Sequence, residues 1–170
     1  MAVKKVLLLG NPKLRRKSVE VEEFDEKLDK IIADLKDTLT QLQNKQNIGR
    51  ALAAPQIGYL KKVIYCNTKE EEIIMINPEI VDKSEEMFAV WDSCFSFKTS
   101  FFVNIPRHKR IKVKFMDEDG REINRVFEDD FSELFQHEID HLHGILATDH
   151  LVSNKNIIMR EEWEKHTIKK

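Results

Sequence analysis

Cysteine is scarce in this chain, and its scarcity excludes a scaffold held together by disulfide bonds. Only two cysteines, Cys66 and Cys94, occur among the 170 residues. Small domains that depend on disulfides carry more cysteines in a shorter chain. We therefore expect a protein of a reducing compartment, the cytoplasm, or of an organelle if a transit peptide precedes this sequence.

Long apolar runs and an excess of positive charge are also missing. No run approaches the roughly 18 apolar residues that cross a bilayer. The short apolar run that ends at Gly10-Asn11-Pro12 is too brief for a signal peptide, so residues 1–9 are expected to form a strand or an ordered arm. The 28 basic and 30 acidic residues give a net charge of −2. We expect no membrane and no directly bound nucleic acid as partner.

The chain lacks a linker, an internal repeat and a low-complexity segment, so we expect a single domain over residues 1–170. Apolar residues recur at helical spacing in two long segments, 25–46 and 129–142, and a third helix is expected over 154–166. Short strands are expected between the first two helices, at 63–66, 73–76, 86–91, 110–115 and 122–127. This order of elements favours the α+β class.

A run of small residues with one proline, 49–58, separates the first helix from the strands. Its composition suits neither a helix nor a central strand. Small side chains let a backbone approach a ligand or another strand closely. We therefore expect the backbone of this run to lie close to a ligand or to another strand.

The sequence His137-Glu138-Ile139-Asp140-His141 predicts a metal site on the second long helix. Residues four apart lie one turn above each other on the same helical face, so His137 and His141 can point two imidazoles at one ion. Glu138 then lies within reach of a water on that ion. Asp140 lies off this face, and we expect it to bond to backbone or an arginine.

A third ligand must come from elsewhere in the chain. Cys66 lies within an apolar strand and is expected to belong to the core. Cys94 lies at the polar end of a strand, where a thiolate would complete a Cys-His-His site with a fourth position open for water. An open position is typical of catalytic sites. The histidines at 108, 143, 150 and 166 are expected to be solvated or structural.

Three stretches of the chain, 49–56, 92–96 and 137–141, resemble the three motifs of the peptide deformylase family in order and spacing. The family motifs read Gly-x-Gly-Leu-Ala-Ala-x-Gln, Glu-Gly-Cys-Leu-Ser and His-Glu-x-Asp-His. This chain departs from them at Ala51, Asp92, Ser93 and Phe95, which stand for Gly, Glu, Gly and Leu. The resemblance covers nearly the whole chain.

The resemblance implies an α+β fold of several short antiparallel sheets packed around a central metal-binding helix. It implies a hydrolase that removes the N-formyl group from the first residue, formyl-methionine, of newly made peptides and releases formate. It also implies one divalent metal ion, Fe(II), with zinc, nickel or cobalt as substitutes. The segment 151–170 resembles the C-terminal helix of bacterial-type members, which favours a monomer; contact with the ribosome stays open.

The family roles can be carried over to the matching residues. Cys94, His137 and His141 would hold the metal, which lowers the pKa of a bound water from about 15.7 to about 7. Glu138 would accept the proton of the water and pass it to the leaving nitrogen. The Gln56 side chain and the backbone N–H of Phe95 would then stabilise the developing oxyanion.

The substrate would add as an extended strand to a sheet edge, where main-chain hydrogen bonds give affinity. By the same resemblance, the docking edges would be Gly49, Arg50 and Ala51 on one side and the segment that includes Asp92 on the other. Arg107 matches a family arginine near the mouth of the site. A surface salt bridge is the alternative interpretation of Arg107.

Two acidic residues depart from the family in the pocket for the first side chain. Asp130 and Glu133 precede His137 by seven and four residues and share its helical stripe, where typical members have apolar residues. Three interpretations remain open: the pocket is open and wet, the acids pair with Arg50, or they meet a cationic or polar substrate group. Asp130 alone is also a common residue for a helix start. We hypothesise a weakened preference for methionine.

Three other functions compete with deformylation of formyl-methionine peptides. An amidase of the same mechanism would act on a different formyl or acyl amine. A metal-containing binding module with weak catalysis would not need Glu138 and Gln56. A zinc endopeptidase would usually take its third ligand downstream, which Cys94 makes unnecessary.

Overall fold

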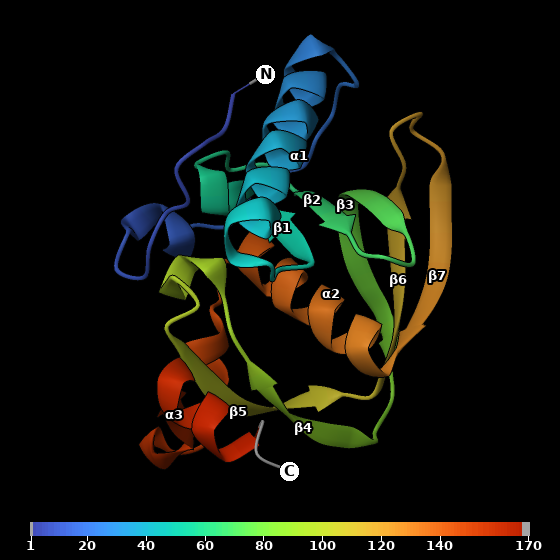
Figure 1. Ribbon diagram of the computed structural model, residues 1–170. Helices are drawn as coiled ribbons and strands as arrows, with labels where there is room; N and C mark the ends of the chain where they lie inside the picture. Colours follow the sequence, from blue (N-terminus) through green and yellow to red (C-terminus); the bar gives the residue numbers. More distant parts are fainter. Residues whose placement is uncertain (1, 168–170) are drawn as a thin grey trace.

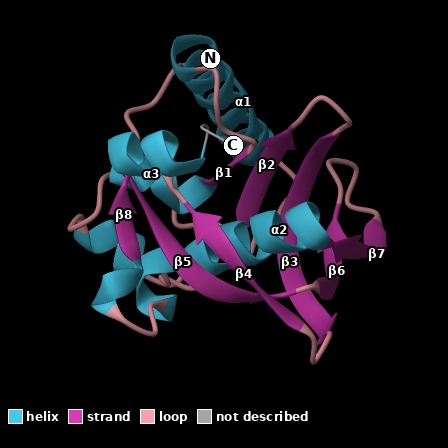
Figure 2. Ribbon diagram, turned by 60° about the horizontal axis from the view of Figure 1, so that its bottom comes forward, coloured by secondary structure: helices cyan, strands magenta, loops and turns pink. Residues whose placement is uncertain are grey.

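The computed structural model describes residues 2–167, in which helix α2, Asp129–Leu142, lies between two antiparallel sheets. In Figure 2, α2 runs behind β4 and β5 and in front of β2 and β3. The predicted α+β class, with small antiparallel sheets around a central helix, is confirmed. The site-bearing helix therefore reaches both sheets.

The larger sheet has the strand order β1-β2-β3-β6-β7. Its strands pair antiparallel throughout, and β1 forms one edge. The bounds are β1 Ala51–Ala53, β2 Val63–Asn67, β3 Glu72–Lys83, β6 Arg110–Met116 and β7 Glu122–Glu128. β1 lies in the run of small residues, as an edge strand rather than a central one, and a 3₁₀ helix, Ala54–Ile57, follows it.

The smaller sheet has the order β4-β5-β8, with bounds Met87–Asp92, Phe101–His108 and Ile157–Met159. β5 was not among the expected strands. Pro106 lies near its end and, as a proline, cannot donate a ladder hydrogen bond. The structure tolerates this proline because β8 pairs only with residues 101–103, which leaves one side of β5 free beyond them. β4 forms the other edge of this sheet.

Helix α1, Glu26–Gln46, covers one face of the larger sheet (Figure 1). The Asp25 carboxylate caps it by accepting hydrogen bonds from the N–H groups of Lys27 and Leu28 at 3.0 and 3.1 Å. Asn47 ends the helix with φ of 54°. The predicted helix over 25–46 is confirmed.

Helix α2 carries an apolar and a polar face. Leu134, Phe135, Ile139 and Leu142 pack into a core with strands of the larger sheet. The polar face of α2 carries His137 and turns toward the smaller sheet. There the His137 side chain contacts Asp92 of β4. A third core lies around Cys94, Val103 and Leu146. The metal-binding motif is thus placed between an apolar core and a buried polar layer.

At the chain ends, the prediction of one C-terminal helix is wrong, whereas the ordered arm that was one of the two N-terminal expectations is confirmed. The segment 154–166 is not one helix: a 3₁₀ turn, Asn154–Asn156, and β8 precede α3, Arg160–Thr167, because residues 157–159 pair with β5. Residues 2–8 form an ordered arm without strand pairing, whose Leu7 N–H donates to the Gln56 carbonyl at 2.7 Å. Residue 1 of the N-terminal prediction lies outside the described residues, and so do residues 168–170 of the segment 151–170 that resembles the C-terminal helix of the family.

The remaining short helices are of the 3₁₀ type and connect the larger elements. One of them, Phe95–Phe97, follows β4 directly, and its N-cap is Cys94. The others are Pro12–Arg15 and Ala147–His150. None of the helices in the described part of the chain is both long and apolar enough to cross a membrane.

Candidate metal centre and its cleft

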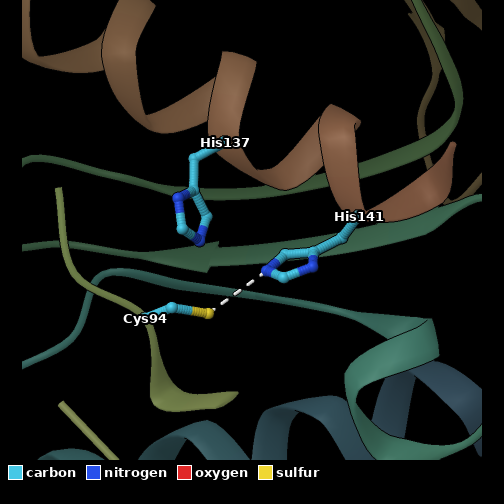
Figure 3. Close-up of side chains that lie close together, drawn as sticks. All are labelled: Cys94, His137 and His141. Atoms are coloured by element: carbon cyan, nitrogen blue, oxygen red, sulfur yellow. Dashed lines mark hydrogen bonds between the residues drawn. The ribbon is translucent and has the colours of Figure 1, made fainter. Parts of the chain in front are cut away.

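Cys94, His137 and His141 converge at the polar face of α2. Their ligand atoms lie within 4.8 Å of one another, and all three residues are buried. The Cys94 Sγ lies 3.3 Å from Nε2 of His141, as Figure 3 shows, and the two imidazoles meet edge to face with ring centroids 4.9 Å apart. Ligands of a tetrahedral ion bound at about 2.0–2.3 Å lie roughly 3.5 Å apart. The three residues therefore fit one metal ion with little movement.

Asp92 fixes the orientation of His137. A carboxylate oxygen of Asp92 lies 2.9 Å from Nδ1 of His137, which leaves Nε2 free to face the other ligands. Burial acts to raise the pKa of Asp92, but His137 and Arg107 lower it to about 2. The Asp92 carboxylate is occupied by His137 and Arg107, while Asp92 itself lines the cleft, so contact of its backbone with a substrate stays a prediction.

Arg107 is buried, and this corrects both interpretations made from the sequence. Its side chain is 3% exposed, so it is neither at the mouth of the site nor part of a surface salt bridge. It donates to Asp92 at 3.1 Å and to Asp140 at 2.6 Å. His150 lies 2.7 Å from the same oxygen of Asp140. The expected bond of Asp140 to an arginine is confirmed, and His150 belongs to this network.

The two ligand histidines have opposite electrostatic surroundings. Burial and His137 lower the pKa of His141 to about 3, which keeps its imidazole neutral. Burial acts to lower the pKa of His137 too, but Asp92 and Cys94 raise it well above its usual value. Surroundings that hold a proton on His137 also attract a metal cation, which is consistent with the fit of the three ligands.

Glu138 is buried beside the first histidine, and one of its carboxylate oxygens has no hydrogen-bond partner among residues 2–167. Burial raises its pKa to about 7. A buried carboxylate that is unpaired and titrates near neutrality is costly for stability and typical of an acid–base group. The arrangement can exchange a proton with a molecule bound next to the three ligands.

Gln56 directs its side-chain amide N–H toward Cys94, one of the three candidate metal ligands. Its Oε1 accepts a hydrogen bond from the Ala53 N–H at 2.9 Å, which fixes the orientation of the amide. Its Nε2 therefore faces Cys94 Sγ and Ser96 Oγ, each at 3.3 Å. The sequence alone did not single out Ser96, whose hydroxyl helps to hold this amide in place.

The contact between Gly49 and Phe95 brings the small-residue run, 49–58, close to the segment that carries Cys94. Gly49 has φ of 103°, and a Cβ there would lie 2.1 Å from the Phe95 ring. Only glycine allows this approach. Phe95 follows the ligand Cys94 directly, so its backbone lies next to the three ligands.

The site opens into a cleft of about 710 Å³. Both edge strands contribute to it: Ala51 from β1, and Phe88 to Asp92 from β4. The α3 segment adds an aromatic wall that sequence reasoning missed, in which Trp163 stacks on Phe102 with centroids 4.6 Å apart. The cleft is thus lined by two strands that each form the edge of a sheet.

Arg50, Asp130 and Glu133 also line this cleft. Nη2 of Arg50 lies 2.6 Å from a carboxylate oxygen of Glu133, and Nη1 donates to the backbone carbonyl of Asp130 at 3.3 Å. Burial raises the pKa of Glu133 although Arg50 acts to lower it. For Glu133, the structure bears out the interpretation that the acid pairs with Arg50.

The other candidate ligands lie away from the site. Cys66 is a buried core thiol, and burial raises its pKa to about 12. His108 bonds through Nδ1 to the carbonyl oxygen of Ser84 at 2.7 Å. His143 is exposed and caps the end of α2. These residues have the structural roles that their sequence context predicted.

Comparison with known proteins agrees with the geometry. The polypeptide deformylase family model matches residues 3–156. A peptide deformylase of Desulfotalea psychrophila is 36% identical over 97% of this chain and 97% of its own. Peptide deformylase 2 of Clostridium acetobutylicum is 40% identical over 88% of this chain and 95% of its own. The crystal structure of a Thermotoga maritima peptide deformylase has a TM-score of 0.83 at 33% identity, covering 90% of this chain and all of that one.

Proposed function

The chain belongs to the peptide deformylase family, and from this premise we propose how its residues carry out the family reaction. It is a metal-dependent hydrolase that removes the N-formyl group from nascent peptides and releases formate. The observation that carries the proposal is the convergence of Cys94, His137 and His141 beside the unpaired carboxylate of Glu138.

We propose that Cys94, His137 and His141 hold one divalent ion, with Fe(II) as the native metal. A thiolate with two imidazoles is compatible with Fe(II) and with zinc, and the family resemblance favours Fe(II). When bound, the ion acts as a Lewis acid and makes hydroxide available at neutral pH. Asp92 keeps Nε2 of His137 directed at the ion by holding Nδ1.

Three groups of this chain would act on the formyl group. Glu138 takes the proton of the attacking water and delivers it to the leaving nitrogen, since its pKa of about 7 allows both transfers. The Nε2 amide of Gln56 and the backbone N–H of Phe95 donate to the oxygen on which negative charge develops. The Ala53 N–H already fixes the orientation of the Gln56 amide, so donation to this oxygen would require only that Nε2 exchange one of its contacts with Cys94 Sγ or Ser96 Oγ.

The peptide would lie extended between β1 and β4. The backbone of Gly49, Arg50 and Ala51 offers one edge, and the end of β4 before Cys94 offers the other, with both lining the cleft. Main-chain hydrogen bonds would give affinity irrespective of sequence. The first side chain would then point toward Arg50 and Glu133.

Formate release tests this proposal. Anaerobically purified, iron-loaded protein should release formate from a panel of formyl-peptides. Glu138→Gln should retain the metal but lose turnover by at least about a hundredfold. Glu128→Gln, an exposed residue at the start of the same helix, is the matched control and should be unaffected. Full activity in Glu138→Gln would refute the assigned role.

We further propose that residues 1–170 act as one catalytic domain, as a monomer in the cytoplasm on peptides emerging from the ribosome. The support is the family resemblance, which includes the C-terminal helix. Light scattering at the concentration used for activity tests the monomer directly.

A further inference from the structure

The wall of the cleft next to His137 is charged. Arg50, Asp130 and Glu133 line it together with His137 and Glu138. If the proposed function holds, this wall faces the first side chain of the formylated substrate. Its chemistry then decides which formylated compounds the site accepts.

Arg50 is held on two sides. It contacts Glu133 at 2.6 Å through Nη2 and the Asp130 carbonyl at 3.3 Å through Nη1. The Glu133 side chain is 12% exposed, whereas that of Arg50 is 42% exposed. The pair is therefore fixed within the wall and partly accessible to a ligand.

Negative charge exceeds positive charge in this wall. One guanidinium stands beside two acidic residues: it pairs with the Glu133 carboxylate but contacts only the backbone carbonyl of Asp130. Within residues 2–167, no ion pair is formed by the exposed Asp130 carboxylate. The carboxylates of this wall can therefore accept more hydrogen bonds than Arg50 donates to them.

An apolar side chain fits this wall poorly. It would cover the Arg50–Glu133 pair and remove water without offering a hydrogen bond, which is unfavourable for charged groups. Arg50 and Asp130 also line a second cavity of about 550 Å³, whose other lining residues include Asn67, Thr68, Lys69 and Glu70. A long side chain that passes the wall would thus also end among polar groups.

We propose that the cleft selects a formylated substrate whose first side chain ends in a cationic hydrogen-bond donor, as that of lysine does, over the apolar side chain of methionine. The donor would bind the acceptor capacity of Asp130 and Glu133. The alkyl stem would lie along the wall, as lysine stems commonly do.

Three formyl-tripeptides that differ only in the first residue test this. Lysine and norleucine have the same carbon stem and differ by the ammonium group, and glutamate carries the opposite charge. The readout is kcat/KM for formate release by the iron-loaded protein. The lysine peptide should exceed the norleucine peptide, and the glutamate peptide should be the poorest.

Variants connect the preference to the wall. The double variant Asp130→Asn with Glu133→Gln keeps the side-chain shapes and should lower the lysine-to-norleucine ratio by about fivefold, the size of a partly exposed charge interaction. Replacing both Arg50 and Glu133 by isoleucine should favour norleucine. Asp129→Asn, an exposed acid outside the cleft lining, is the control and should leave the ratio unchanged.

The results distinguish a failure of the proposed side-chain selectivity from a failure of the proposed deformylase function. A norleucine preference that Asp130→Asn with Glu133→Gln does not alter would overturn the selectivity and leave the deformylase function intact. Absence of formate from every peptide, in protein shown to contain metal and to unfold cooperatively, would overturn the proposed function itself. A lysine preference that disappears in the double variant supports both.

Discussion

Arg107 and Arg50 each bind a carboxylate of α2 at the same distance, 2.6 Å, yet they have different surroundings. Arg107 is 3% exposed and also reaches Asp92, which holds a metal ligand. Arg50 is 42% exposed and lines the open cleft. The distance between two charges therefore does not indicate their role, whereas burial and the identity of the next partner do.

The physical difference is in the cost of losing a partner. A charge left alone in the interior loses several kcal/mol of solvation, while an exposed charge regains water. The Arg107 network can therefore hold His137 rigidly, and the Arg50 pair can exchange partners with a ligand. A third pair, Arg15 with Asp149, is more exposed still, at 47% and 37%.

The largest effect is expected at Arg107. Arg107→Met leaves Asp92 and Asp140 buried without their cation and should lower the free energy of unfolding by about 3–5 kcal/mol. Denaturant unfolding measures this. Arg110→Met, which removes an exposed pair with Asp82, is the control and should cost under about 1 kcal/mol. Equal costs for the two variants would contradict the comparison.

The next effect concerns the metal. Asp92→Asn keeps the shape of the side chain but removes the negative charge beside Nδ1 of His137. Metal affinity should fall about 10–100-fold, as is usual when the partner of a ligand histidine is removed. Competition with a chelator measures it. Asp82→Asn is the matched surface control; an unchanged affinity in Asp92→Asn would show that Asp92 does not position the ligand.

Breaking the cleft pair should matter less for stability. Arg50→Met removes the partner of Glu133, but water reaches this part of the cleft. The free energy of unfolding should therefore change by less than about 1 kcal/mol. The same denaturant series measures it. A loss as large as that of Arg107→Met would place Arg50 among the structural arginines.

The smallest effect is expected at Asp149 and depends on pH. Burial acts to raise the pKa of Asp149, but Arg15 and the Leu146 N–H lower it below its ordinary value of 3.8. A lowered folded-state pKa gives stability that is present above pH 3.8 and is lost as pH falls through the folded value. Asp149→Asn should therefore be less stable than the parent at pH 7, with the difference shrinking below pH 3.8. A constant difference down to pH 2 would contradict this.

Local elements could be predicted from the sequence because their signals are local. The helical spacing of apolar residues predicted α1, and the histidines four residues apart predicted two ligands on α2. β5 and β8 could not be predicted in this way. The first contains Pro106, and the second is only three residues long and exists because it pairs with β5.

The sequence by itself determined that His137 and His141 share one helical face and that acidic residues precede them at Asp130 and Glu133, since helical periodicity acts within one segment. The family resemblance, rather than local spacing, pointed to Cys94 as the third candidate ligand. Only the tertiary structure decided that Arg107 is buried behind the metal site while Arg50 faces the cleft. Both are arginines near strand segments, and nothing local separates them. Their burial depends on which distant strands and helices pack around them. Such long-range packing produces no periodic pattern of residues in the sequence.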